Sequence, residues 1–449
     1  ATSGNAKIAV AGAGSVAAGN TALTLTLTPS AAAAGSLAGN LSLGFTSVAP
    51  NGTGLADAAL TGATVAITGA AYDYAQPGYS TSALAFGNLR VGATPAAKTV
   101  TFTNAAVTDA AYQESLKVVA TGAAGKFTAT GFDSLDAGSA TAAVSVSAVT
   151  ATAGLLNGNL ALGLTSLAKA NTGLGDTALT GGSVAVTGAV YDVAQPTFTD
   201  GAVLAFGNVH VGDVLATRNA SFANTVVTSA EYQDALRVLA AAGNAKISAA
   251  NLTSLAAGAT ADLVVTASTT AAGSLAGNVD LALTSLAKSG TGLADVTLNA
   301  AQLTTTGAVY DYAQPTYAGA TLAFGNVRTG ATVAAQGITV HNLVVTDAAY
   351  QEALAVSAAS ANGKLSLAGL SGLVAGDTAG TVEVAAVTTS AGSLAGTVNL
   401  GFTSLAMANT GLTNTTLTGG SVAVTGAVYD YATAGLTSKV LAFGPIHVG

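Results

Sequence analysis

Cysteine and tryptophan are both absent from this 449-residue chain, and only 8% of its residues are Asp, Glu, Lys or Arg. Without cysteine there are no disulfide cross-links and no thiolate metal sites. An average globular protein carries about 25% charged residues, so solubility here must rest on Thr, Ser, Asn and the backbone. The net charge of -8 is spread thinly, and no basic cluster could neutralise a row of phosphates. Nucleic acid is therefore not an expected partner.

Long apolar runs are also missing, because Gly, Thr, Ser and Asn interrupt every window of 18 residues, and no membrane span is predicted. The opening residues, Ala1 to Gly4, show neither the basic nor the apolar part of a secretion signal. With three histidines and no cysteine, a transition-metal cluster is not expected either.

The dominant positive feature is an internal repeat of about 119 residues, which has to be recognised before any other pattern is interpreted. A Tyr-Asp pair recurs at Tyr72, Tyr191, Tyr310 and Tyr429. The spacing predicts a partial repeat over 1–77, full repeats over 78–196, 197–315 and 316–434, and a segment over 435–449 that is the first strand of a further repeat or a donor strand.

Within a repeat the apolar residues alternate with polar ones, as Val100 and Phe102 do with the threonines around them. Turn residues, Asn104 among them, separate these short stretches. About seven strands and no long helical period predict an all-β chain of tandem immunoglobulin-like sandwiches. A parallel β-helix is the alternative, but its rungs should repeat every 20 to 25 residues or so. One segment, 108–114, resembles a helical turn capped by Asp109.

Several motifs resemble the choice-of-anchor D repeats of bacterial cell-surface proteins, relatives of the ASPM-SPD-2-Hydin modules. They are the segments 84–92, 100–104 and 136–138, followed by Gly154 and Gly158. The resemblance implies seven-stranded sandwiches strung along large exported proteins, often anchored at the cell surface. It implies no catalytic residues.

Acidic residues recur beside the predicted joints between repeats and are candidate Ca²⁺ ligands, since Ca²⁺ prefers several oxygen ligands. No other cofactor is expected. A second acidic series is predicted to cap backbone groups in turns. The joint series is Asp73, Asp192, Asp311 and Asp430, and the turn series is Asp57, Asp176 and Asp295 with Asn414.

The tyrosines of the repeated pair are predicted to pack one repeat on the next. Basic residues share another repeat position, which His210 and His447 hold at two of its occurrences and Arg90 and Arg328 at the other two. We interpret these exchanges as solvent-type substitutions. The expected interface residues are Tyr72, Tyr191, Tyr310 and Tyr429 with Val440, Leu441, Ala442 and Phe443.

The two ends of the sequence suggest how chains could join. Lys7 aligns with Lys126, so residues 1–77 lack counterparts of the strands near 84–91, 98–104 and 115–120. Missing strands leave edges that invite pairing with another chain. Residues 438–449 supply one such strand, which gives the hypothesis of head-to-tail strand addition. Two strands stay unaccounted for, and the alternative is a piece of a longer covalent array.

Together these features predict a non-catalytic, extracellular or cell-surface structural protein that forms a filament, sheath, stalk or surface layer. Its partners would be copies of itself or further repeats, with cell-surface or matrix contacts. The alternative is an adhesin or glycan-binding protein displayed on a repeat stalk. An enzyme would need a polar cluster that breaks the repeat, and none stands out.

Overall fold

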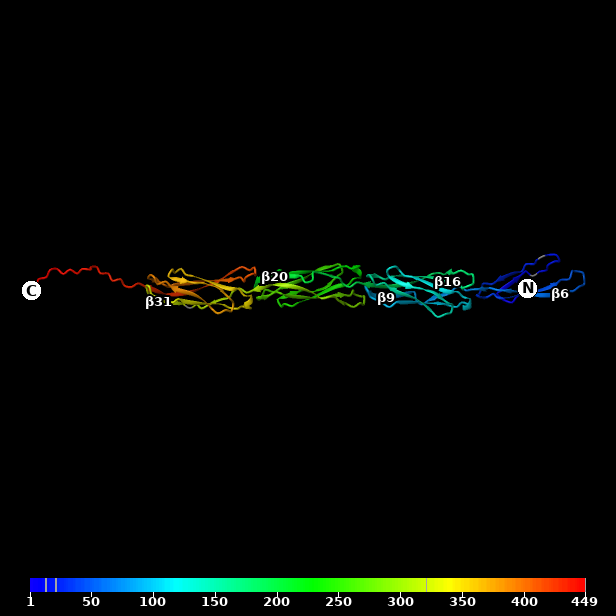
Figure 1. The fold of residues 1–449 in the computed structure, drawn as a ribbon, viewed down its shortest axis with the longest axis horizontal. Coiled ribbons are helices and arrows are strands. Elements are labelled where there is room, and N and C mark those ends of the chain that lie inside the picture. The colour runs from blue at the N-terminus through cyan, green and yellow to red at the C-terminus, as the bar shows by residue number, and fades with distance from the viewer. Residues whose placement is uncertain (13, 21, 320, 449) are drawn as a thin grey trace.

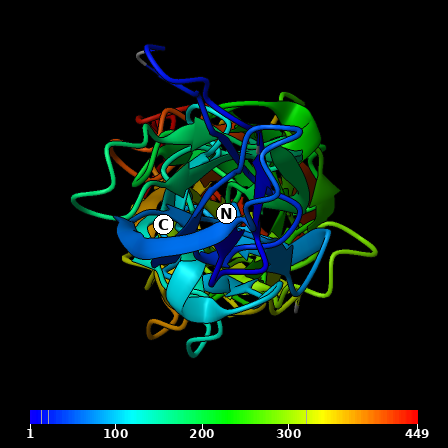
Figure 2. The ribbon, with the colours of Figure 1, turned by 90° about the vertical axis from the view of Figure 1, so that its right-hand side faces the viewer.

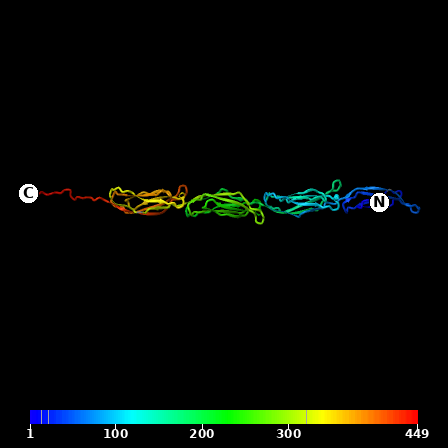
Figure 3. The same ribbon diagram turned by 90° about the horizontal axis from the view of Figure 1, so that it is seen from below.

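The chain is a rod of β-sandwich units placed end to end, as a computed structural model of residues 1–12, 14–20, 22–319 and 321–448 shows (Figures 1 and 3). Viewed along the rod, the units project onto one another (Figure 2). Beyond the last unit, the residues after Tyr429 run out as an extended tail with no strand pairing among the described residues.

The second unit, residues 77–191, shows the complete pattern of two facing sheets. One sheet has the strand order β12-β14-β10-β8, and the other has β13-β11-β16-β18 with β9 added to the free edge of β18. Its elements are β8 (Pro77–Tyr79), β9 (Ala83–Arg90), β10 (Lys98–Asn104), η1 (Ala110–Tyr112), β11 (Ser115–Thr121), β12 (Phe127–Thr130), β13 (Phe132–Leu135), β14 (Ala142–Ala148), β15 (Gly154–Leu155), β16 (Gly158–Leu167), β17 (Thr177–Ala178) and β18 (Gly182–Tyr191).

The third and fourth units, residues 196–310 and 315–429, repeat this arrangement. The third contains β19 (Pro196–Thr197), β20 (Val203–His210), β21 (Arg218–Asn224), η2 (Ala230–Tyr232), β22 (Ala235–Ala242), β23 (Ile247–Ala249), β24 (Leu252–Leu255), β25 (Thr260–Ala267), β26 (Gly273–Ser274), β27 (Gly277–Leu286), β28 (Val296–Thr297) and β29 (Ala301–Tyr310). The fourth contains β30 (Pro315–Tyr317), β31 (Leu322–Arg328), β32 (Gln336–Asn342), η3 (Ala348–Tyr350), β33 (Ala353–Ala359), β34 (Leu365–Leu367), β35 (Leu370–Leu373), β36 (Gly380–Ala386), β37 (Gly392–Ser393), β38 (Gly396–Leu405) and β39 (Thr415–Tyr429).

Each complete unit has its own apolar core between the sheets, because the inward residues of both sheets alternate with polar outward ones. In the second unit, Val100 and Phe102 of β10 and Val144 of β14 are fully buried. This topology confirms the predicted immunoglobulin-like sandwich and excludes the β-helix alternative. Within the described ranges, no helix has the length and apolar character that a bilayer crossing requires.

One edge strand of each complete unit pairs in parallel with the unit's last strand. β9 follows β18 with a register shift beside Gly188, whose φ is +157°. A Cβ atom at Gly188 would lie 2.8 Å from the Gly87 carbonyl oxygen, so only glycine permits this approach. Gly69 holds the equivalent position in the first unit with a φ of +146°.

The local turn predictions are confirmed. Asp109 caps η1 by accepting the Ala111 N–H. Asp176 Oδ1 accepts the Ala168 N–H at 2.9 Å, and Asp57, Asp295 and Asn414 do the same in their own units. The recurrent acids of this series therefore close loops.

A buried asparagine at the end of one strand corrects the interpretation of Asn104 as only a turn residue. Its counterpart Asn224 is 0% exposed, and its side chain makes four hydrogen bonds. Its Oδ1 accepts from the Gln195 N–H and from Gln233, and its Nδ2 donates to the carbonyls of Asp234 and Leu255. Asn104 and Asn342 make the equivalent four bonds. The residue ties four segments of the sandwich together.

The first unit, residues 2–71, has fewer strands. Its described residues contain no counterpart of β9 or β10, and the edge of β6 that faces away from β5 is unpaired. Phe45, Leu60 and Val65 are consequently 46 to 54% exposed. Its strands are β1 (Thr2–Ser3), β2 (Ile8–Ala11), β3 (Thr26–Pro29), β4 (Gly35–Ser36), β5 (Gly39–Ser47), β6 (Ala58–Ile67) and β7 (Ala70–Ala71).

Candidate functional site: the joints between units

Every joint begins with a tyrosine pair. Tyr191, the last residue of β18, packs against Tyr232 of η2 with ring centroids 5.6 Å apart. Tyr72 packs against Tyr112, and Tyr310 against Tyr350, both at 5.8 Å. The structure thus places three of the predicted interface tyrosines in joints. Tyr429, at the end of β39, has no unit beyond it in the described chain and is 52% exposed.

A backbone clasp follows each tyrosine. The Asp192 N–H donates to the Tyr232 carbonyl at 2.8 Å, and the Asp234 N–H donates back to the Asp192 carbonyl at 3.1 Å. The same two bonds join Asp73 to the second unit and Asp311 to the fourth. Because main-chain atoms make the clasp, it tolerates side-chain exchange and restricts bending at every joint.

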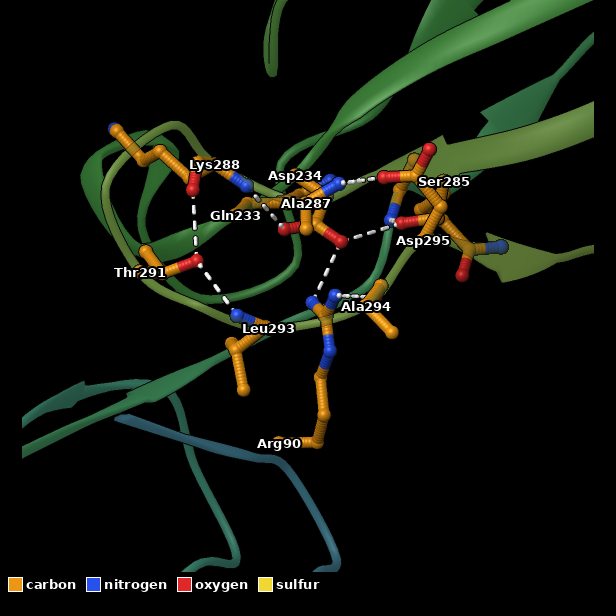
Figure 4. Close-up of polar contacts among 12 residues, drawn as sticks. Arg90, Gln233, Asp234, Ser285, Ala287, Lys288, Thr291, Leu293, Ala294 and Asp295 are labelled. Carbon is orange, nitrogen blue, oxygen red and sulfur yellow. Dashed lines mark hydrogen bonds and ion pairs between the residues drawn. The ribbon is translucent and has the colours of Figure 1, made fainter. Parts of the chain in front are cut away.

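The joint between the second and third units also contains a buried ion pair (Figure 4). Arg90, the last residue of β9, donates from Nη1 to Asp234 Oδ2 at 2.5 Å and from Nη2 to the Ala294 carbonyl at 2.8 Å. The Asp234 side chain is 0% exposed and the Arg90 side chain 19%. Ser285 Oγ donates to the same carboxylate oxygen at 2.7 Å. Two units are therefore held by one shielded charge pair.

The next joint uses a different pair at the same place. His210 Nε2 lies 2.8 Å from Glu352 Oε1, and Ser404 Oγ donates to Glu352 Oε2 at 2.6 Å. The imidazole is stacked on Tyr312, with ring centroids 4.1 Å apart. A long base meets a short acid in the first case, and a short base meets a long acid in the second. In both joints one longer side chain thus meets one shorter one, a pairing that we call the length rule.

The joint between the first and second units has the acid without its base. Glu114 is 2% exposed, and Ser166 Oγ donates to its Oε2 at 2.6 Å, as in the other joints. No Lys, Arg or His of the described residues pairs with Glu114. The basic residue should come from a β9-type strand on β6, which the described part of the first unit lacks.

These pairs correct the interpretation of Arg90 and His210 as solvent-type substitutions. Both lie in joints and bind buried acids, 144 and 142 residues away in sequence. Arg328, by contrast, is solvent-facing: it donates to the Asp430 carbonyl and lies over the Tyr431 ring. The sequence did contain a signal for these pairs. Where the acid changes from Asp234 to Glu352, the base at the other repeat position changes from Arg90 to His210.

The joint aspartates predicted as Ca²⁺ ligands are not part of any cluster of three or more potential ligands in the described part of the chain. Asp192 and Asp311 are each 5% exposed, and their Oδ2 atoms, like that of Asp73, have no hydrogen-bond partner among the described residues. Asp430 is exposed. Within that same part of the chain, no three His, Asp or Glu side chains gather as a metal site would require. Calcium binding at the joints stays a prediction, which titration of the protein with Ca²⁺ would check.

The tyrosine pairs predict that alkaline pH loosens a joint. Burial, and after it the neighbouring Tyr350, raises the pKa of Tyr310 above its ordinary value of 10.0. A raised pKa in the folded state means that the stabilisation is complete below pH 10 and is lost as the pH rises through the folded value. Tyrosinate absorbance from Tyr310 should therefore rise at a higher pH than that of an ordinary tyrosine, together with a loss of rod stiffness in X-ray scattering. Replacing Tyr310 with Phe should remove this part of the alkaline transition.

Two further features lie outside the joints. The predicted interface residues Val440, Leu441 and Phe443 lie in the tail, 75 to 83% exposed. The third unit also has a groove of about 590 Å³, lined by Asp200, Asp280 and Gln302 with Leu239. Sequence reasoning missed this groove, because its polar residues come from three separate strands and loops.

Comparisons with known proteins return matches among solved structures. No protein-family model and no curated protein matches the chain. Among solved structures, the cadherin domains 1–5 of protocadherin gamma B2 are 10% identical, with a TM-score of 0.44 over 96% of this chain and 73% of that one. Mouse protocadherin-24 domains 1–3 give 10% and 0.35 over 78% and 98%. The I67–I69 fragment of titin gives 11% and 0.29 over 79% and 99%. The immunoglobulin-like assignment itself rests on the sheet topology described above.

Proposed function

We propose that this protein is a non-catalytic structural component whose sandwich units form an end-to-end filament, sheath, stalk or surface layer. The observation that carries the proposal is the joint, in which a tyrosine pair and a backbone clasp recur between successive units. A buried ion pair is added between the second and third units and between the third and fourth. Such repeated, partly buried joints make a stiff rod. A stiff rod is suited to holding two points at a fixed distance and not to catalysis.

Strand addition between chains is the second part of the proposal. The tail segment 440–447 has the residue pattern of β20, and β6 with β7 has that of β29. In the third unit, Leu204 pairs with Thr305, Gly207 with Gly307 and His210 with Tyr310. The equivalent register would pair Leu441 with Ile67, Gly444 with Gly69 and His447 with Tyr72. Main-chain bonds provide affinity in such strand addition, and side chains provide register.

The apolar residues at both partners support this pairing. Phe206 and Phe324, which hold the Phe443 position in complete units, are 4 and 7% exposed in their cores. Phe443 itself is 83% exposed, and so it gains burial by docking against the open first unit. Pro445 is compatible with this edge strand. His447, two positions after it, is equivalent to His210, whose N–H points away from β29 and bonds Asp213. Residues two apart in a strand direct their N–H groups to the same side, so the N–H that proline lacks at position 445 would not face β6.

Electron microscopy of the purified chain tests the proposal. Fibres several rod lengths long are expected, and removing residues 438–449 should leave single rods. Dispersed rods from the intact chain at all concentrations would contradict self-assembly, and fibres of normal length after the deletion would contradict strand addition. A chain with Ala434→Ser alone, outside the docking segment, serves as the control.

An extracellular or cell-surface location belongs to the same proposal, with copies of itself and matrix or surface molecules as partners. It is supported by the resemblance of segments 84–92 and 100–104 to choice-of-anchor D repeats. The second candidate function is an adhesin or glycan-binding protein. The groove of the third unit favours it, since Asp280 and Gln302, hydrogen-bonded to each other at 2.6 Å, line an open surface with Asp200. Glycan binding lost on replacing Asp280 with Ala would support that alternative.

A further inference from the structure

Glu114 is a buried carboxylate at a joint that lacks its cation. In the fourth unit, the equivalent Glu352 bonds Ser404 through Oε2 and His210 through Oε1. In the second unit, Glu114 keeps the serine bond through Oε2, while its Oε1 has no partner among the described residues. An isolated buried charge is costly, and buried carboxylates in proteins are normally paired. The joint is therefore built for a basic side chain that arrives from elsewhere.

We propose that His447 of a second copy of this chain supplies that base. This inference rests on the proposed strand addition and names the contact that makes it specific. His447 holds the position of Arg90 and His210 at the end of a β9-type strand. Docked on β6 in the register of the complete units, it lies beside Tyr72 at the joint that contains Glu114.

The length rule of the internal joints selects histidine for this place. Asp234 is bound by arginine and Glu352 by histidine, so a long acid takes a short base. Glu114 is a glutamate, and the tail carries a histidine. Among the described residues, Glu114 is thus a long acid without a basic partner, and His447 is a short base without an acidic one.

The Tyr72 carbonyl supports the same docking. In the complete units, the residue after the basic one donates its N–H to the joint tyrosine: Val91 to Tyr191 and Val211 to Tyr310, both at 3.0 Å. The Tyr72 carbonyl receives no such bond within the described ranges. Val448 follows His447 and would supply it.

Two complementary variants test the proposal in the full chain. His447→Arg should place a base that is too long opposite Glu114, and Glu114→Asp an acid that is too short for His447. Each variant alone should assemble with a dissociation constant raised about 30-fold, or about 2 kcal/mol, since mispairing a buried interface charge costs this much. In a mixture, the two variants can alternate along the polymer. The new arginine of one variant then meets the new aspartate of the other, and the unchanged histidine meets the unchanged glutamate. Every junction is matched, so the mixture should restore wild-type assembly.

The double variant His447→Arg with Glu114→Asp should also assemble like the wild type, because it copies the Arg90–Asp234 pair. Lys98→Arg, a change of an exposed basic side chain on β10 within the second unit, is the control and should assemble normally. Assembly is measured by sedimentation velocity and electron microscopy. If the wild type never polymerises, the proposed function itself fails. If the wild type polymerises and both single variants match it, or if the mixture restores nothing, the His447–Glu114 contact is overturned while strand addition stands.

Discussion

Replacing Arg90 with methionine should weaken the joint between the second and third units by about 3 kcal/mol, since removing one partner of a buried ion pair costs about 3–5 kcal/mol. Asp234, with a side chain that is 0% exposed, would keep Ser285 but lose its cation. The amides of Asp192 and Asp234 report on joint opening, because each donates a hydrogen bond across the joint. Their hydrogen exchange should accelerate roughly 100-fold at about 1.4 kcal/mol per factor of ten.

Two variants make this prediction specific. Arg328→Met changes the same strand position in the fourth unit, where the side chain bonds only the Asp430 carbonyl among the described residues, and should leave exchange unchanged. Adding Asp234→Asn to Arg90→Met removes the stranded charge and should recover most of the loss. Equal exchange rates in Arg90→Met and wild type would show that the clasp alone holds the joint.

Replacing Asn224 with alanine should destabilise the third unit by about 4 kcal/mol. The change leaves the Gln195 N–H and the carbonyls of Asp234 and Leu255 without their partner, and each buried unpaired group costs about 1–3 kcal/mol. Calorimetry of the whole chain should show one transition moving to lower temperature. Exchange measurements should locate the loss in residues 196–310.

Asn219 gives the matched control for this experiment. It lies on the same strand, β21, but its side chain is exposed and bonds only Asp262 among the described residues. Asn219→Ala should change stability by less than about 0.5 kcal/mol. A shift of all transitions by Asn224→Ala would instead mean that the units unfold as one body.

The fold was accessible from sequence because its determinants are local and repeated. Alternation such as Val100 and Phe102 among threonines specifies a strand with one buried face, whatever its neighbours are. The spacing of the tyrosines at 72, 191 and 310 marks where such units end. Asp109 caps its turn through bonds to residues two positions away, which a short motif also encodes.

Asn104 shows where local interpretation fails. As a residue between two strands it is typical of a turn, and it does end β10. Its buried role depends on Gln76, Gln113 and the carbonyl of Leu135, which approach only when both sheets are assembled. A polar residue that satisfies distant backbone groups has no periodic signature of its own.

The sequence by itself determined the repeat, the two-faced strands, the immunoglobulin-like architecture and the tyrosines at the joints, because each follows from spacing and side-chain alternation. Only the tertiary structure decided which charges meet. Arg90 reaches Asp234, and His210 reaches Glu352, because rigid units are rotated and stacked so that the end of one edge strand faces the next unit. That geometry results from the packing of whole units and is not encoded in any single segment. It also identifies Glu114 as a buried joint acid that has no basic partner among the described residues.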